Sequence, residues 1–489
     1  MSDLIISLSG IRGIVGKSFT QIEASIATNL FFKIYLKSKE QPQKIIIGQD
    51  IKPTGKTFLQ TVTNVLYQNK IENIINLGIT TLPIMQWAVR YFKASGGIFI
   101  TASHNPIEYN GIKFISSYQN GAGILSTSMM QKIKDAWEQE PKNITADIKE
   151  LPSETLCIDE YNRDVTGKVE KIIDLCSGKV GKGEEIFLKI KEKQPKIALD
   201  ACSKEGFKIP KSFLISIGIE EENIYSINMK ELSECKRRLE PSPVYLTELN
   251  QTVEQHNLDI GFAFDPDQDR LVIMPLYSEE LTPILCAKFL LELQKQSNIK
   301  HIKNIAINLS TSSLWEYMAE EYGIEIIRTR VGEINVVEAM QTHSLSLGAE
   351  GNGGIILKDV NAGRNSTVAM ALILAYMIWS NQSIQELESQ LPKYFMVKDK
   401  IAISIPQEKI SKFLNEKMNT FTEQNKNEIK SLDTQDGYKI IFKDNSWIHI
   451  RMSNTEPIIR IIAESGNTQT ANLLISNFKS IILIKKYSQ

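Results

Sequence analysis

The sequence predicts an α/β protein of several domains, with a smaller α+β domain at its C-terminal end. Three observations support this fold class. At 489 residues the chain is too long for one hydrophobic core. Short apolar runs alternate with longer amphipathic segments through most of the chain, which is the pattern of βα units. Beyond about residue 389 several strand patterns follow one another before a closing helix, which indicates an α+β block.

The individual elements follow from local apolar patterns. Four short runs are each followed by turn residues and then a helical pattern, at residues 44–48, 196–200, 260–264 and 304–308. In the C-terminal block we expect strands at 401–405, 438–442, 447–451 and 458–463. The apolar run 368–379 is too short to cross a bilayer and predicts a buried helix. Polar stretches are interpreted as linkers near 140–156 and 390–400, and as a surface insertion at 177–195.

Composition restricts the class of function. The formal net charge is −1, so no strong field attracts nucleic acid or an anionic membrane, and we expect neither as a partner. The five cysteines are scattered and form no CxxC pair, which argues against a disulfide framework and a zinc site. The N-terminus lacks the basic region of a signal peptide, so a cytoplasmic location is expected. Only eleven of the 56 basic residues are arginines, and five of them lie in candidate motifs, namely Arg12, Arg270, Arg364, Arg451 and Arg460.

A loop after the apolar run 97–100 displays several reactive groups together. The segment Thr101-Ala102-Ser103-His104-Asn105-Pro106 cannot continue a strand, because its proline has a fixed φ and no N–H. It therefore presents the Ser103 hydroxyl and the His104 imidazole, and the Lys113 ammonium group follows. Taken alone, the segment is also compatible with an ordinary polar turn or with an acyl-transfer nucleophile.

Three carboxylates at alternate positions, Asp265, Asp267 and Asp269, follow the run 260–264. Such a group is costly to hold together unless a cation neutralises it, and its oxygen ligands suit Mg²⁺. An EF-hand would need Gly and Glu where Arg270 and Leu276 stand. A haloacid-dehalogenase nucleophile would need Thr or Val in place of Asp269. A solvated acidic turn remains as the alternative to a metal loop.

Two further loops carry groups suited to a sugar phosphate. Near the C-terminus a predicted strand ends in Arg451-Met452-Ser453-Asn454-Thr455-Glu456-Pro457, and Arg460 follows. A guanidinium fork with several neutral donors is what binding a phosphate dianion requires, although a plain N-cap and turn is the alternative. The glycine-rich stretch 349–354 offers Glu350 and Asn352 to sugar hydroxyls, and Arg12 lies between glycines near the N-terminus. Neither of these last two features is specific alone.

In their order along the chain, these loops resemble the motifs of the α-D-phosphohexomutase family. The resemblance rests on Thr-Ala-Ser-His-Asn-Pro, Asp-x-Asp-x-Asp-Arg and Arg-x-Ser-Asn-Thr-Glu-Pro, and it covers essentially the whole chain. It implies four domains around a central cleft, three related α/β domains with mixed sheets and a C-terminal α+β domain. We expect their boundaries at 1–155, 156–280, 281–388 and 389–489.

The resemblance also implies a role for each loop. Ser103 would carry a phosphoryl group, and the three aspartates would hold Mg²⁺ against it. His104, Lys113 and Arg12 match positions associated with proton transfer and transition-state charge. The implied substrate contacts are Arg270, Glu350, Asn352, Arg451, Ser453, Asn454, Thr455 and Arg460. Phosphoserine would donate to a hexose phosphate through a 1,6-bisphosphate intermediate, and a glucose 1,6-bisphosphate-type activator would prime Ser103.

The sugar loop departs from the pattern Glu-x-Ser-Gly-His of many members, since here it is Glu350-Gly351-Asn352-Gly353-Gly354. Together with residues 331–338 it looks most like the phosphoglucosamine mutase branch. We therefore expect conversion of glucosamine 6-phosphate to glucosamine 1-phosphate, with mannose or glucose phosphates as the close alternative. A serine-dependent sugar phosphatase and a non-catalytic sugar-phosphate binder are alternatives from other classes. The oligomeric state, monomer or homodimer, stays open.

Overall fold

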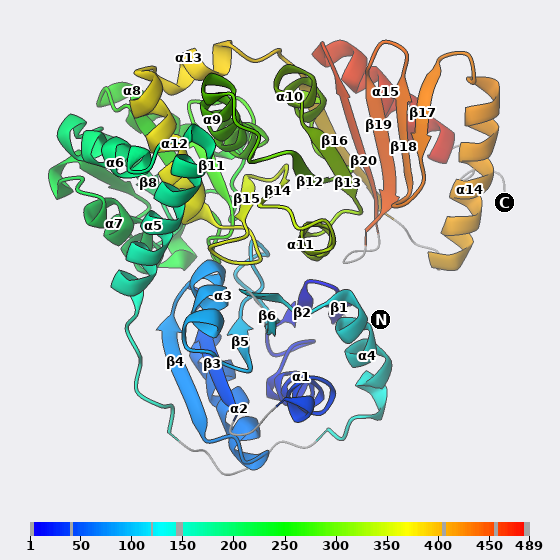
Figure 1. Cartoon of the computed structure of the whole chain (residues 1–489). Coiled ribbons are helices and arrows are strands. Elements are labelled where there is room, and N and C mark those ends of the chain that lie inside the picture. Colours follow the sequence, from blue (N-terminus) through cyan, green and yellow to red (C-terminus); the bar gives the residue numbers. More distant parts are fainter. Residues whose placement is uncertain are drawn as a thin grey trace.

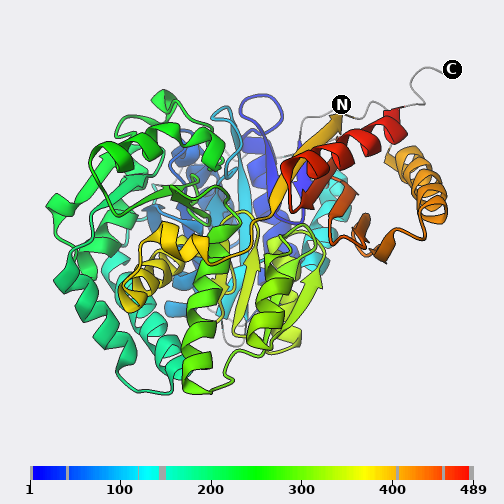
Figure 2. The same ribbon diagram turned by 90° about the horizontal axis from the view of Figure 1, so that it is seen from above.

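The computed structural model describes residues 4–39, 43–118, 121–142, 150–402, 407–453 and 458–483. Over these ranges the chain forms four domains, each built on one β-sheet (Figure 1). The first domain lies below the other three in Figure 1, and the C-terminal domain lies at one end of the molecule in both Figure 1 and Figure 2. The α/β class with a C-terminal α+β domain is confirmed.

The sheet of the first domain has the order β1-β2-β6-β5-β3-β4, with β7 beside β6. Its strands are β1 (Ile5–Ser7), β2 (Gly10–Ile14), β3 (Lys44–Gln49), β4 (Asn73–Ile79), β5 (Gly96–Ile100), β6 (Tyr109–Tyr118) and β7 (Gly121–Ile124). Its helices are α1 (Gln21–Ile34), α2 (Gly55–Gln68), α3 (Leu82–Tyr91) and α4 (Thr127–Ala136). Both faces of β3 are covered, because Ile45 and Ile47 pack in the core with α1 and α2, whereas Ile46 packs with α3.

The second and third domains have similar sheets, β11-β10-β8-β9 and β13-β12-β14-β15. The second contains α5 (Ile158–Ser177), α6 (Lys182–Lys193), β8 (Ile197–Asp200), α7 (Lys204–Ser216), β9 (Ile224–Ile227), α8 (Thr247–Gln255), β10 (Ile260–Phe264) and β11 (Leu271–Met274). The third contains α9 (Leu281–Ser297), β12 (Asn304–Asn308), α10 (Leu314–Tyr322), β13 (Glu325–Thr329), α11 (Glu333–Thr342), β14 (Leu347–Glu350), β15 (Gly354–Leu357), α12 (Ser366–Ser380) and α13 (Ile384–Ser389).

One strand arrangement recurs in the first three domains and places the loops of interest. In β4-β3-β5-β6, β9-β8-β10-β11 and β13-β12-β14-β15, three parallel strands are followed by an antiparallel fourth. The serine loop joins β5 to β6, the acidic loop joins β10 to β11, and the glycine-rich loop joins β14 to β15. The three loops therefore occupy equivalent positions in related domains.

The C-terminal domain is an antiparallel sheet of order β16-β20-β19-β18-β17. Its elements are β16 (Phe395–Ala402), α14 (Gln407–Gln424), β17 (Ile429–Asp433), β18 (Tyr438–Phe442), β19 (Trp447–Met452), β20 (Ile458–Ser465) and α15 (Thr468–Leu483). Apolar residues of α14 and α15 share one core with the sheet. Arg451 on β19 pairs with Arg460 on β20, so the two arginines lie side by side in the sheet.

Three sequence expectations are wrong. The expected linker 390–400 contains most of β16, an edge strand whose charged residues, such as Lys398 and Lys400, are exposed. The expected surface insertion contains α6, which buries Ile186 and Ile190 against neighbouring helices. No helix follows β10 directly, because the acidic loop turns the chain back into β11.

Other expectations are confirmed. Strands occupy the runs near 44–48, 196–200, 304–308, 438–442, 447–451 and 458–463, and the run 368–379 lies in the buried helix α12. The strand expected at 401–405 begins earlier, and its residues 403–405 lie outside the described ranges. Within those ranges, none of the helices has the length and hydropathy needed to cross a membrane.

Candidate active site

Ser103 lies in the loop between β5 and β6 and is buried. Its φ of 49° is in the left-handed region, which is uncommon for a residue with a Cβ and must be held by its surroundings. The Ser103 N–H donates to Thr101 Oγ1 at 2.8 Å, and the Thr101 hydroxyl donates to Asp50 Oδ2 at 2.5 Å. On the other side of the loop, Lys52 Nζ donates to the carbonyl of Asn105 at 2.7 Å. Two buried residues just after β3 therefore fix the serine loop.

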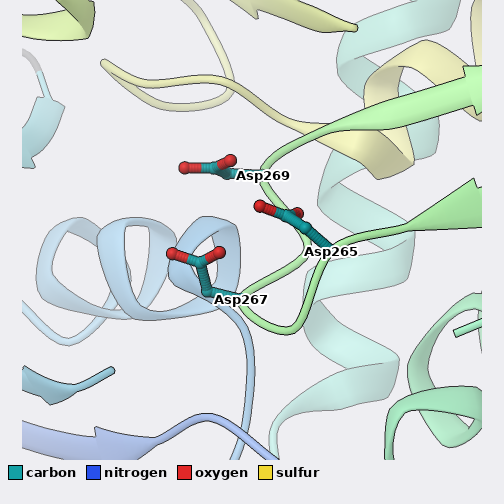
Figure 3. A group of neighbouring side chains, drawn as sticks. All are labelled: Asp265, Asp267 and Asp269. Atoms are coloured by element: carbon teal, nitrogen blue, oxygen red, sulfur yellow. The ribbon is translucent and has the colours of Figure 1, made fainter. Parts of the chain in front are cut away.

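The acidic loop lies against the serine hydroxyl. Ser103 Oγ donates to Asp267 Oδ1 at 2.9 Å and lies 3.3 Å from Asp265 Oδ2. Carboxylate oxygens of Asp265, Asp267 and Asp269 lie within 4.8 Å of one another, and Figure 3 shows the three side chains leaving the turn towards the same side. All three side chains are buried. The structure thus brings together the loops that the sequence predicted to act jointly.

The acidic group is suited to a divalent cation. Burial, and then the charges of Asp267 and Asp269, raise the pKa of Asp265 well above its ordinary value. Among the described residues, no hydrogen-bond donor meets the buried Asp269 Oδ1. A buried oxygen without a donor, in a cluster of carboxylates, fits the oxygen-ligand set of Mg²⁺.

Lys113, on β6, reaches the same carboxylates. Its Nζ donates to Asp267 Oδ2 at 2.6 Å and lies 3.7 Å from Asp269 Oδ2. Burial works against the charged ammonium, but Asp267 and Asp269 outweigh it and raise the pKa of Lys113. The ammonium is therefore held protonated close to Ser103.

Two other predicted groups flank the serine. His104 Nδ1 lies 3.4 Å from Ser103 Oγ, and His104 Nε2 lies 3.8 Å from Glu240 Oε1. Burial and the nearby Arg270 lower the pKa of His104, which favours the neutral imidazole. Arg12 Nη1 donates to Asn105 Oδ1 at 2.8 Å, so Arg12 is tied to the serine loop.

Arg364 joins the acidic loop to the third domain. Its guanidinium donates to Asp269 Oδ2 at 2.7 Å and to Glu333 Oε2 at 2.9 Å, and lies 3.1 Å from Glu350 Oε2. All four side chains are buried. One arginine therefore neutralises carboxylates from two domains and couples the acidic loop to the glycine-rich loop.

Replacing Arg364 with Met should destabilise the protein. It leaves three buried carboxylates without their shared cation, and breaking a buried ion pair in this way costs about 3–5 kcal/mol. Urea unfolding followed by circular dichroism would measure the loss. Arg163→Met, at an exposed position on α5, is the matched control and should leave unfolding unchanged. Equal urea midpoints of unfolding for the two variants would show that Arg364 does not stabilise the buried carboxylates.

A cavity of about 320 Å³ lies where these loops meet, and residues of all four domains line it. Nine predicted residues line it, namely Arg12, Ser103, His104, Lys113, Arg270, Glu350, Asn352, Arg451 and Arg460. Among the described residues, no acceptor meets the buried Arg451 Nε, and no donor meets the buried Asn352 Oδ1. Ser453 is buried, and its N–H donates to the carbonyl of Ile458 at the start of β20 at 2.9 Å. Asn454 and Thr455 lie outside the described ranges.

Several residues that line the cavity were not predicted from the sequence. Glu240, Glu280, Glu333 and Lys398 line the cavity with the predicted set. Glu333 lies in the segment 331–338, which contributed to the family resemblance but was not assigned a role in the site. Lys398 falls in the stretch interpreted as a linker, and its Nζ donates to Glu279 Oε1 at 2.8 Å across the domain boundary. Only the spacing of acidic and basic residues in that stretch could have indicated a role.

Four domain families match the chain in succession. They are the phosphoglucomutase/phosphomannomutase alpha/beta/alpha domains I, II and III, at residues 4–143, 182–275 and 281–395, and the C-terminal domain at 408–478. A phosphoglucosamine/phosphogalactosamine mutase of Sulfurisphaera tokodaii is 30% identical over 480 residues, which are 97% of this chain and 98% of that protein. The chain belongs to the phosphoglucomutase/phosphomannomutase family. It is a phosphohexomutase, an enzyme of the isomerase class.

Solved structures show that this phosphohexomutase shares the family fold. A putative phosphomannomutase from Thermus thermophilus superposes with a TM-score of 0.76 at 18% identity, over 99% of this chain and all of that one (100%). An N-acetylphosphoglucosamine mutase of Aspergillus fumigatus, solved with GlcNAc-6P and magnesium, has a TM-score of 0.55 at 13% identity, over 94% and 80% of the two chains. The predicted family and four-domain architecture are therefore confirmed.

Proposed function

We propose that this phosphohexomutase transfers its phosphoryl group through Ser103 and acts preferentially on glucosamine phosphates. The position of the Ser103 hydroxyl carries the first part of the proposal. It lies at hydrogen-bond distance from Asp267, beside Lys113 and His104, at a cavity lined by all four domains. Such a constellation supplies a nucleophile, positive charge and a proton acceptor within one pocket.

Asp265, Asp267 and Asp269 are the residues that would hold Mg²⁺. The bound cation would neutralise charge on the phosphoryl group during transfer. The chain's own residues then have distinct tasks. Lys113 and Arg12 stabilise negative charge beside Ser103, and His104 accepts or returns a proton.

The reaction divides into two phosphoryl transfers. The phosphoserine gives its phosphoryl group to a free hydroxyl of the hexose phosphate, forming a 1,6-bisphosphate. After this intermediate turns round in the cavity, its other phosphoryl group returns to Ser103. Arg451, Ser453, Arg460, Asn454 and Thr455 are proposed to hold the phosphate that does not react, and a sugar 1,6-bisphosphate primes an unphosphorylated Ser103. The buried Arg451 Nε, which lacks an acceptor among the described residues, supports an anion site there.

Removal of divalent cations should abolish mutase activity. With excess EDTA the three carboxylates lose the charge that balances them beside the phosphoryl group, and turnover should fall to the background rate. Addition of Mg²⁺ beyond the chelator should restore it, as a coupled assay of product formation would show. Undiminished turnover after exhaustive chelation would contradict the assignment of the acidic loop.

The preference for an amino sugar rests on the glycine-rich loop. Asn352 Oδ1 is a buried acceptor without a donor among the described residues, and Asn352 and Glu350 line the cavity together with Arg270. Acceptor oxygens suit the ammonium group of glucosamine as well as sugar hydroxyls. The relative from S. tokodaii, named a phosphoglucosamine/phosphogalactosamine mutase, supports the same choice.

A comparison of four substrates tests this preference. The 1-phosphates of glucosamine, mannose, glucose and N-acetylglucosamine would be assayed with Mg²⁺ and a trace of glucose 1,6-bisphosphate. We expect the highest kcat/KM for glucosamine 1-phosphate. A higher value for mannose or glucose 1-phosphate would identify the enzyme as a phosphomannomutase/phosphoglucomutase instead, and release of inorganic phosphate without isomerisation would indicate a phosphatase.

A further inference from the structure

Two cysteines, Cys202 and Cys235, lie close together in the second domain, next to the strand that leads into the acidic loop. Cys202 follows β8 and is fully buried, and Cys235 lies partly exposed in the segment between β9 and α8. Both belong to one small cluster that also contains Ile51 and Leu232. Both sulfurs also contact Arg237, Cys202 Sγ through the guanidinium group and Cys235 Sγ through the backbone carbonyl, so the two thiols lie close together.

Arg237 gives this pair an unusual environment. Its Nη2 lies 3.2 Å from Cys202 Sγ, and Cys235 Sγ donates to the Arg237 carbonyl at 3.8 Å. The neighbouring Cys202 thiol and the Arg237 charge outweigh burial and lower the pKa of the Cys235 thiol to about 7. The pKa of Cys202 is raised, by the interaction with Cys235 and by burial. A partly exposed thiol of lowered pKa beside a second, protonated thiol is the arrangement of reversible redox sites.

The pair lies between the two loops that meet at Ser103. Cys202 Sγ donates to the carbonyl of Phe264 at 3.4 Å, and Phe264 directly precedes the acidic loop. Arg237 Nη2 donates to the same carbonyl at 2.7 Å. On the other side, Ile51 packs in the cluster with Cys202 and stands between Asp50 and Lys52, which fix the serine loop. A structural change at Cys202 and Cys235 would therefore alter contacts of both the acidic loop and the serine loop.

We propose that Cys202 and Cys235 form a reversible disulfide on exposure to peroxide, and that this bond lowers mutase activity. The Cys235 thiolate attacks hydrogen peroxide, which yields a sulfenic acid and hydroxide. The Cys202 thiol then attacks the sulfenic sulfur, an S–S bond forms, and the sulfenic oxygen leaves as water. In sum, two thiols and one peroxide give one disulfide and two waters, and a thiol reductant reverses the change.

The disulfide removes one of the contacts that hold the start of the acidic loop. Cys202 then has no S–H to donate to the carbonyl of Phe264. Since phosphoryl transfer depends on accurate placement of Ser103 against the carboxylates, we expect a fall in kcat of roughly 10- to 100-fold. The fall should be reversed by dithiothreitol.

The test treats the phosphorylated, Mg²⁺-loaded enzyme with hydrogen peroxide, then measures its mass, its activity and its cross-linked peptides. We expect the loss of two hydrogen atoms, a peptide joining Cys202 to Cys235, and reversible inactivation. Cys235→Ser and Cys202→Ser should resist inactivation, whereas Cys176→Ala, which removes another buried thiol, should behave as wild type. Differential alkylation of wild type gives the same pairing should a variant fail to fold.

Three outcomes would overturn the proposal. The first is free Cys202 and Cys235 thiols after treatment that inactivates the enzyme. The second is oxidation of Cys235 to a sulfinic acid while Cys202 stays alkylatable. The third is a disulfide that forms without any change in turnover. The mass and peptide measurements do not depend on which hexose phosphate the enzyme uses.

Discussion

Replacement of Ser103 with Ala is expected to lower mutase turnover by roughly 10⁴-fold or more, because the variant has no atom to carry the phosphoryl group. The fold should survive, since Ala removes only the hydroxyl that donates to Asp267. The measurement is a coupled assay with saturating glucose 1,6-bisphosphate. Because the primer supplies phosphoryl groups in excess, the loss of turnover cannot be attributed to a lack of primer.

The matched control is Ser128→Ala, at an exposed position on α4. It should have wild-type activity. A Ser103→Ala variant that keeps a tenth or more of the wild-type rate (roughly one decade or less of loss) would show that phosphoryl transfer does not pass through this hydroxyl. It would leave the family assignment intact but overturn the proposed mechanism.

Replacement of Lys113 with Met should have the second largest effect. Met keeps most of the volume of the side chain but removes the ammonium that lies 2.6 Å from Asp267 and 3.7 Å from Asp269. We expect kcat to fall on the order of 10²- to 10⁴-fold, the range for loss of an acid, a base or a charge stabiliser at the reacting group. KM should change less, since Lys113 acts beside the transferred group.

Lys134→Met, on the exposed face of α4, serves as the control and should be silent. Thermal unfolding of both variants separates a catalytic effect from a loss of structure. An unchanged kcat in a folded Lys113→Met enzyme would remove Lys113 from the catalytic set.

The sequence indicated the loops well because their chemistry is local. Ser103 with His104, and the three aspartates, each occupy one short segment after an apolar run, so spacing and residue type sufficed to predict them. The sheet topology places these loops at equivalent positions of related domains, and contacts between the domains bring them together at Ser103. The order of strands in a sheet is not visible in one sequence without knowledge of which strands pair.

The supporting residues could not be predicted for the same reason. Arg364 contacts Asp269 across 95 positions of sequence, and the Thr101 hydroxyl contacts Asp50 across 51. Strand β16 was mistaken for a linker because an edge strand exposes half its side chains and can carry charges on that face. Long-range contacts and edge strands both depend on tertiary context, which a local pattern does not contain.

The central claim is that Ser103 carries the phosphoryl group, and the mass of the intact protein tests it most directly. The enzyme would be incubated with glucose 1,6-bisphosphate and Mg²⁺, freed of small molecules, weighed, and digested to locate any phosphate. We predict one added phosphoryl group on Ser103 in the wild type and none in Ser103→Ala. A wild-type enzyme that stays unmodified while it is active, or that carries its phosphate on another residue, would contradict the claim.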